Sequence, residues 1–197
     1  GGRLLERKGL MCSCKTSWRR HLLRVVPLLV MIALVVGLSW FLREFVIQPY
    51  EIPSGSMETT IMTGDKVFSE RVTYYFRDIE PGDIVTFEDK EIPGRILIKR
   101  CIATEGQTVD LIDGRVYVDG VALDEPYTRG LPSEPLKTAL GVEVSYPYTV
   151  PEGHLWVMGD NRTNSKDSRY FGSVKAKSVT GKGCFIYWPL ESFGVLQ

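Results

Sequence analysis

The feature that most constrains this chain is an uninterrupted apolar run near its N-terminus. The run reads VVPLLVMIALVVGLSWFL, residues 25–42, and none of its 18 residues is charged. A helix of this length, rising about 1.5 Å per residue, would be roughly 27 Å long, close to the roughly 30 Å of a bilayer's hydrocarbon core. A helix that packs into a water-soluble core is normally amphipathic. We therefore predict that residues 25–42 form a transmembrane anchor.

The charge on either side of the run predicts its orientation. Residues 1–24 carry seven Lys or Arg side chains against one acid, Glu6. Such a tail could bind nucleic acid, but its position beside an apolar segment favours membrane lipid as the partner. By the positive-inside rule, residues 1–24 are a basic cytoplasmic tail and residues 43–197 lie outside the cell. This arrangement is a single pass through the plasma membrane, with no nucleic-acid partner.

The same order of basic and apolar residues also occurs in removable signal peptides. The run here is longer than the usual apolar core of such a peptide, however, and the residues after it, REFVIQPYEIP, are bulky where a cleavage site needs small ones. An uncleaved anchor is the better interpretation.

Residues 43–197 have the pattern of a β-domain. Short β-branched or aromatic runs such as GDIVTFED, RILIKRCIAT and VTGKGCFIYWP are separated by Gly, Pro and Asp. The run DLIDGRVYVDG predicts a hairpin that turns at Asp113–Gly114. We predict a mainly β fold: an antiparallel β-sheet domain with a small β-rich accessory insertion at about residues 108–150, preceded by the one N-terminal helix.

Cysteine and histidine usage argues against a disulfide framework and against a metal. Cys12 and Cys14 lie in the predicted cytoplasmic tail, where thiols stay reduced. Cys101 and Cys184 lie on predicted strands and are expected to be buried free thiols. With only two histidines in the chain, a zinc site is not expected, and no metal or cofactor is predicted.

Two serines flank one glycine in YEIPSGSMETTIMTGD, residues 50–65. A turn would explain Pro, Ser and Gly at this place, but a serine nucleophile beside the membrane is the alternative. A nucleophilic Ser56 needs a base. His154 is the only histidine after the apolar run, and its place at the start of a predicted strand favours a structural role.

Lys99 is the other candidate for the base. In RILIKRCIA, alternation places Leu97, Lys99, Cys101 and Ala103 on one strand face. Apolar neighbours desolvate the ammonium group and lower its pKa towards neutrality. The alternative is a lysine at the edge of the sheet with its ammonium group in water.

A third stretch, MGDNRTNSKDSRYFG at residues 158–172, is dense in short polar and oppositely charged side chains. It could be a solvated turn. The density of hydrogen-bonding side chains and the bulky Tyr170 and Phe171 near the end of the stretch favour a buried polar loop that supports an active site.

Together these stretches resemble the boxes of bacterial signal peptidase I, a family of membrane-bound Ser–Lys endopeptidases. PSGSM is similar to the nucleophile box, GDIVTF to a structural strand, ILIKR to the lysine box and GDNRTNSKDSR to the last box, in the same order. The resemblance implies a catalytic domain that removes signal peptides from preproteins. In that family the cut follows small residues, as in Ala-x-Ala.

The resemblance also implies a role for each matching residue. Ser56 is the nucleophile and Lys99 the general base, while the Ser54 hydroxyl and the Ser56 backbone N–H form the oxyanion hole. Ser165 would hydrogen-bond the lysine amine and orient it. Two ion pairs, Arg100 with Asp160 and Asp167 with Arg169, would support the dyad. The expected lining of the substrate pocket is Tyr50, Ile52, Pro53, Met57, Ile61, Val67 and Ile98.

Two rival functions are weighed against this one. The self-cleaving SOS repressors also resemble Ser–Lys proteases, but they are soluble and bind DNA, and this chain has no helix-turn-helix pattern. A membrane-anchored β-domain without activity, acting as a binding or scaffold module, is the second rival. The presence of both Ser56 and Lys99 argues against it.

Overall fold

The computed structural model describes residues 10–196, and its chain divides into a helical unit that ends at Phe45 and a second unit from Val46 onward. The helical unit contains α1 (Leu10–Phe41) and the start of a π-helical turn, η1 (Leu42–Val46). Among the residues described, no helix is both long and apolar enough to cross a membrane. The basic tail lies largely outside the description: residues 1–9 are not described, nor are the side chains of residues 10–24, so Cys12 and Cys14 are not described either.

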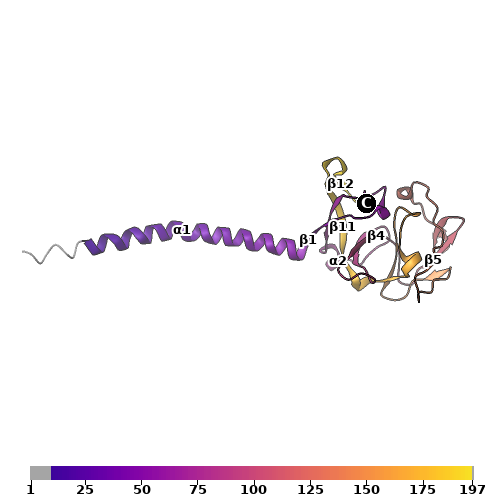
Figure 1. Ribbon diagram of the computed structural model, residues 1–197. Helices are drawn as coiled ribbons and strands as arrows, with labels where there is room; N and C mark the ends of the chain where they lie inside the picture. Colours follow the sequence, from indigo (N-terminus) through magenta and orange to yellow (C-terminus); the bar gives the residue numbers. More distant parts are fainter. Residues whose placement is uncertain (1–9, 197) are drawn as a thin grey trace, which may run out of the picture. The chain divides into compact units, whose positions relative to one another are not determined.

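The second unit is built around a curved antiparallel sheet (Figure 1). Its strand order is β1-β2-β11-β3-β4-β9-β10, and β12 adds to β11. The strands of this sheet are β1 (Ile47–Glu51), β2 (Lys66–Glu70), β3 (Ile84–Glu88), β4 (Ile96–Thr104), β9 (His154–Met158), β10 (Val174–Lys175), β11 (Val179–Trp188) and β12 (Gly194–Val195). Because β11 pairs with both β2 and β3, it joins the strand that follows the serine-containing stretch to the strand that pairs with the lysine-containing β4.

A second antiparallel sheet, of order β7-β6-β5-β8, lies within the stretch expected to form the insertion. Its strands are β5 (Thr108–Ile112), β6 (Arg115–Val118), β7 (Val121–Ala122) and β8 (Tyr148–Thr149). The β5–β6 hairpin turns at Asp113 and Gly114, whose φ angles of 49° and 74° are those of a two-residue hairpin turn. The mainly β, antiparallel fold predicted from the sequence is therefore confirmed.

Short helical turns connect these strands. They are η2 (Gly55–Met57), α2 (Thr73–Phe76), η3 (Pro126–Thr128), α3 (Ser168–Phe171), η4 (Ala176–Ser178) and η5 (Leu190–Ser192). Two of them, η2 and α3, lie in the serine-containing stretch and in the polar stretch of the sequence.

The alternation expected along β4 is interrupted by an irregularity in its pairing with β9, between Cys101 and Ala103. Cys101 packs with Val85 and Val157, whereas Ala103 joins the core cluster around Trp156. The prediction that Ala103 shares the surroundings of Cys101 is thus wrong, because a bulge shifts the strand by one residue relative to its partner. Cys101 and Cys184 are both free thiols, as predicted, but only Cys101 is buried, whereas Cys184 is half-buried.

Candidate active site

Ser56 is presented by the short 3₁₀ turn η2, which directly follows an extended segment. The next residue, Met57, is fully buried in a core cluster with Ile52 and Val67. Backbone hydrogen bonds from Ile52 N–H to the Asp65 carbonyl oxygen, at 2.9 Å, and from Gly64 N–H to the Ile52 carbonyl oxygen, at 2.8 Å, close the loop. Burial of Met57 in this core therefore fixes the position of Ser56, which precedes it in the same turn.

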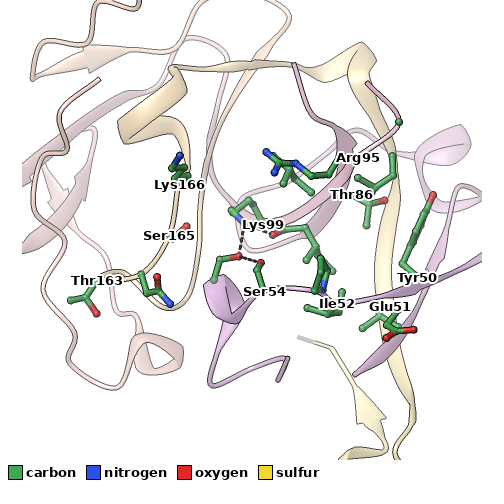
Figure 2. Close-up of a pocket in the computed structure, with 18 of the residues that line it drawn as sticks. Tyr50, Glu51, Ile52, Ser54, Thr86, Arg95, Lys99, Thr163, Ser165 and Lys166 are labelled. Atoms are coloured by element: carbon green, nitrogen blue, oxygen red, sulfur yellow. Dashed lines mark hydrogen bonds between the residues drawn. The ribbon is translucent and has the colours of Figure 1, made fainter. Parts of the chain in front are cut away.

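Lys99 lies in the middle of β4, opposite Val85 of β3, and is only 2% exposed. Its Nζ donates hydrogen bonds to Ser56 Oγ at 2.6 Å and to the Ile98 carbonyl oxygen at 2.9 Å (Figure 2). Ser54 lies beside this pair, with its Oγ 3.5 Å from Ser56 Oγ. The fold thus brings together the two side chains that the sequence proposed as nucleophile and base, although they are 43 residues apart.

Burial lowers the pKa of Lys99 from its ordinary value of 10.5 to about 8. The negative charges of Asp167 and Asp160 act in the opposite direction, whereas the charge of Arg95 lowers the pKa further. Desolvation is the largest of these effects. The amine can therefore be neutral in mildly alkaline solution, and a neutral amine can accept a proton from Ser56.

The loop that follows β9 donates hydrogen bonds to the backbone of the serine turn. Asn161 N–H donates to the Ser56 carbonyl oxygen at 3.1 Å, and Asn161 Nδ2 donates to the Gly55 carbonyl oxygen at 3.0 Å. A Cβ atom on Gly159 would lie only 2.4 Å from the Ser56 carbonyl oxygen, so this approach requires glycine. Asn161 and Gly159 were not among the predicted site residues, although both belong to the polar stretch that the sequence singled out.

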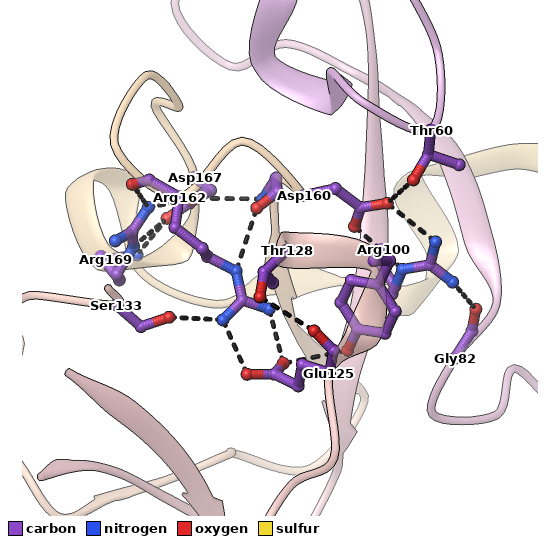
Figure 3. Close-up of polar contacts among 12 residues, drawn as sticks. Thr60, Gly82, Arg100, Glu125, Thr128, Ser133, Asp160, Arg162, Asp167 and Arg169 are labelled. Carbon is purple, nitrogen blue, oxygen red and sulfur yellow. Dashed lines mark hydrogen bonds and ion pairs between the residues drawn. The ribbon is translucent and has the colours of Figure 1, made fainter. Parts of the chain in front are cut away.

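Arg100 and Asp160 form the first of the two predicted ion pairs. Arg100 donates from Nε to Asp160 Oδ1 at 2.9 Å and from Nη2 to Oδ2 at 2.8 Å, and both side chains are buried. Thr60 Oγ1, just beyond the serine turn, donates to Asp160 Oδ2 at 2.5 Å (Figure 3). The pair therefore links the lysine strand, the polar loop and the serine segment.

Arg169 and Asp167 form the second predicted pair, also buried and bidentate, with distances of 2.9 Å from Nε and from Nη2. Asp167 Oδ2 also accepts a hydrogen bond from Gly159 N–H at 3.0 Å. This pair therefore fixes Gly159, against which the serine turn packs.

A third ion pair was not predicted. The Arg162 side chain is 0% exposed, and its Nη2 contacts Glu125 Oε1 at 2.5 Å. Its Nε also donates to the Gly159 carbonyl oxygen at 3.1 Å, and its Nη1 donates to Ser133 Oγ at 2.5 Å. Glu125 and Ser133 belong to the irregular, proline-containing stretch, so the insertion is held against the polar loop (Figure 3).

The structure does not contain the predicted hydrogen bond between Ser165 and Lys99. Ser165 lines the same pocket as Lys99, but its Oγ is buried without a hydrogen-bond partner in the described part of the chain. The reason is orientation: Ser165 Oγ lies against Gly159, only 2.3 Å from where a Cβ atom of that residue would stand. The hydrogen bonds of Lys99 Nζ go to Ser56 and to the Ile98 carbonyl oxygen.

Ser56 and Lys99 line a pocket of about 720 Å³ (Figure 2). Five of the predicted lining residues are present: Tyr50, Ile52, Pro53, Val67 and Ile98. The other two, Met57 and Ile61, do not line the pocket and pack in the core beneath the serine turn. From the sequence alone, an apolar residue of the core cannot be told from an apolar residue that lines the pocket.

The pocket has lining residues that sequence reasoning missed. They are Glu51, Thr86, residues 94–97, Leu136 and the polar residues 163, 164 and 166. Residues 96–99 of β4 pair with β3, whereas the recorded pairing with β9 starts only at Arg100. This part of the strand edge therefore has backbone groups available to a bound peptide.

The other base considered from the sequence lies elsewhere. His154 does not line this pocket, and its Nδ1 lies 2.8 Å from the Glu152 carbonyl oxygen. No group of three or more His, Cys, Asp or Glu side chains able to hold a metal ion occurs in the part of the chain that the structure describes.

The buried serine–lysine pair in a β-sheet pocket is the arrangement expected of a serine peptidase with a lysine base, and comparison with known proteins gives the family. Residues 22–188 match the family model described as "Signal peptidase, peptidase S26". This chain therefore belongs to the peptidase S26 family of signal peptidases.

Two named relatives agree with this assignment. A protein named "Probable signal peptidase I-1" from Synechocystis sp. is 39% identical over 178 residues, which is 87% of this chain and 85% of the relative. "Thylakoidal processing peptidase 1, chloroplastic" from Arabidopsis thaliana is 34% identical over 78% of this chain, which spans 46% of that relative. A solved structure of a signal peptidase I from Enterococcus faecalis is 37% identical, covering 54% of this chain and 97% of that one, with a TM-score of 0.44.

Proposed function

We propose that this chain is a signal peptidase I, a serine endopeptidase that removes N-terminal signal peptides from exported preproteins with a Ser56–Lys99 dyad. The observation that carries the proposal is the 2.6 Å contact between the buried Nζ of Lys99 and Ser56 Oγ. Family membership supports the same activity, because the matched relatives are named as signal peptidases.

The reaction follows from the geometry. Neutral Lys99 takes the proton of Ser56 as Oγ attacks the scissile carbonyl carbon. The Ser56 N–H and the Ser54 hydroxyl stabilise the resulting oxyanion. The protonated lysine then gives its proton to the leaving amine, and an ester remains on Ser56. Water, deprotonated by Lys99, attacks this ester and releases the signal peptide with its new carboxylate.

The pocket fits a peptide with small side chains before the cut. Ile52, Val67 and Ile98 supply an apolar wall beside Ser56, which suits the Ala-x-Ala pattern. The available edge of residues 96–99 would pair with the backbone of the substrate, so the peptide would bind as an added strand.

The membrane anchor is a separate part of the proposal and rests on the sequence. Residues 25–42 contain no charge and follow a basic tail. Their side chains are exposed and apolar on every side of the helix, rather than on one stripe. We place residues 1–24 in the cytoplasm and the β unit on the outer side of the plasma membrane, where exported preproteins arrive.

Replacing Ser56 tests this function. The full chain, solubilised in detergent, is incubated with a preprotein, and the new N-terminus of the product is sequenced. Ser56→Ala should lower the cleavage rate by at least about 1,000-fold, because Ser56 Oγ is the hydroxyl to which Lys99 Nζ is hydrogen-bonded. Its melting temperature should stay within a few degrees of wild type.

Ser192→Ala, in η5 and away from the pocket lining, is the matched control and should retain full activity. A Ser56→Ala protein with a substantial fraction of wild-type activity would show that the nucleophile is wrong. If wild type neither cleaves the preprotein nor reacts with a serine-directed acylating inhibitor, the non-catalytic scaffold module is the better description.

A further inference from the structure

The pocket is unequal on its two sides. Tyr50 and Ile52 lie on one side of Lys99, and the polar loop with Thr163, Ser165 and Lys166 lies on the other (Figure 2). If the small side chains before the cut occupy the apolar side, the residues after the cut extend towards the polar loop. This part of the pocket therefore faces the first residues of the mature protein.

A lysine borders this polar side. Lys166 is exposed and lines the pocket, with its Nζ 4.9 Å from the ring centroid of Tyr170. The structure records no carboxylate partner for Lys166 in the described part of the chain. An ammonium group that stacks on a ring face keeps its other sides open to an anion.

Arg95 provides a second cation. Its side chain is 41% exposed, and its guanidinium group is directed towards the side of the pocket that carries Lys166 (Figure 2). Its Nε donates to Asp89 Oδ2 at 2.5 Å and its Nη2 forms an ion pair with the same oxygen, so Asp89 offsets part of the charge of Arg95, although Asp89 itself is buried and does not line the pocket. The one carboxylate in the pocket lining, Glu51, lies on the Tyr50 side. The lining on the polar side of the pocket thus carries two cationic side chains and no carboxylate.

We propose that Lys166 and Arg95 bind an acidic side chain within the first three residues after the cut bond, so that the enzyme favours preproteins whose mature part begins with Asp or Glu. This inference rests on the proposed signal peptidase function. Because both cations are partly exposed, each contact is worth little, and together they should give about a 3- to 10-fold preference. Salt should weaken that preference by screening.

Matched peptide substrates test the proposal. Each carries an Ala-x-Ala site followed by Gln or Glu at the first, second or third position after the cut, and kcat/KM is measured at low and high salt. Wild type should cleave the Glu peptide about 3- to 10-fold faster than its Gln counterpart at one of these positions, less so in high salt. Lys166→Gln should remove most of this preference by lowering kcat/KM for the Glu peptide towards the value for the Gln peptide.

Two further variants sharpen the test. Lys166→Glu should reverse the preference towards a peptide with Lys at the same position. Lys175→Gln removes an exposed lysine on β10, away from the pocket lining, and should leave the preference unchanged. Equal cleavage of Glu and Gln peptides by wild type at every position would overturn the inference, as would a preference that survives in both Lys166→Gln and Arg95→Gln. Failure to cleave any of the peptides would instead overturn the proposed function, and this inference with it.

Discussion

At the scale of single residues, the protonation of Lys99 decides whether the proposed chemistry can run. Only the neutral amine can accept the Ser56 proton, and burial lowers the pKa of this amine to about 8. The fraction of neutral amine therefore rises as the pH rises through 8. We expect kcat/KM to increase about tenfold per pH unit well below pH 8 and to level off above it, as measured in a pH–rate profile.

Two variants separate this base from a histidine. Lys99→Arg should lose at least about 1,000-fold in activity, because a guanidinium group stays protonated. His154→Ala should leave both the rate and the profile unchanged, since His154 lies outside the pocket lining. An activity limb near pH 6.5 that disappears in His154→Ala, or an active Lys99→Arg enzyme, would contradict the Ser–Lys mechanism.

The sequence could predict Ser56, Lys99 and the ion pair of Arg100 with Asp160, because each stands in a stretch with a recognisable pattern. It could not predict the rotamer of Ser165, which depends on the space that Gly159 leaves open. It also could not distinguish Met57 from Val67. Both are apolar and belong to the same core cluster, and only the packing of η2 and β2 in the folded chain leaves Val67, but not Met57, at the wall of the pocket.

At the scale of elements, the insertion supports the site through one ion pair. Glu125 precedes η3 and binds Arg162, which also holds the Gly159 carbonyl oxygen. Removing one partner of a buried pair leaves the other charge without compensation. We expect Glu125→Ala to lower the free energy of unfolding by about 3 kcal/mol, as measured by urea unfolding.

Glu143→Gln is the control for this prediction, because Glu143 is an exposed acid of the same insertion. It should change the free energy of unfolding by less than about 0.5 kcal/mol. If Glu125→Ala were equally mild, the insertion would not stabilise the polar loop through this pair.

The strands themselves were predictable, since β-branched and aromatic runs bounded by Gly, Pro and Asp mark them locally. The contact between Glu125 and Arg162 was not, because it joins positions 37 residues apart whose approach is set by the whole insertion. Leu136 reaches the pocket from the same irregular stretch and has no local pattern of its own. The bulge in β4 is likewise a property of the pairing of β4 with β9, not of the β4 sequence.

At the scale of the whole molecule, the β unit contains everything that the proposed chemistry needs. Its core clusters and the pocket are built from residues 50–196. Val46 still belongs to this unit, because its carbonyl oxygen accepts a hydrogen bond from Arg71 N–H at 3.4 Å. A chain that starts at Phe45 should therefore fold independently of the helix.

The last prediction concerns that division. The version starting at Phe45 should keep its melting temperature within about 3 °C of the full chain, still cleave a short peptide, and remain in the supernatant after centrifugation.

The full chain should stay with the membrane pellet through carbonate extraction, because transfer of 18 uncharged, mostly apolar residues into lipid is favourable. The double substitution Leu34→Lys and Leu38→Lys should release it, since each lysine near the helix centre costs about 2.5–3.5 kcal/mol of insertion. A full chain that carbonate extracts as readily as the shortened one would show that residues 25–42 are not an anchor, whatever the activity of the β unit.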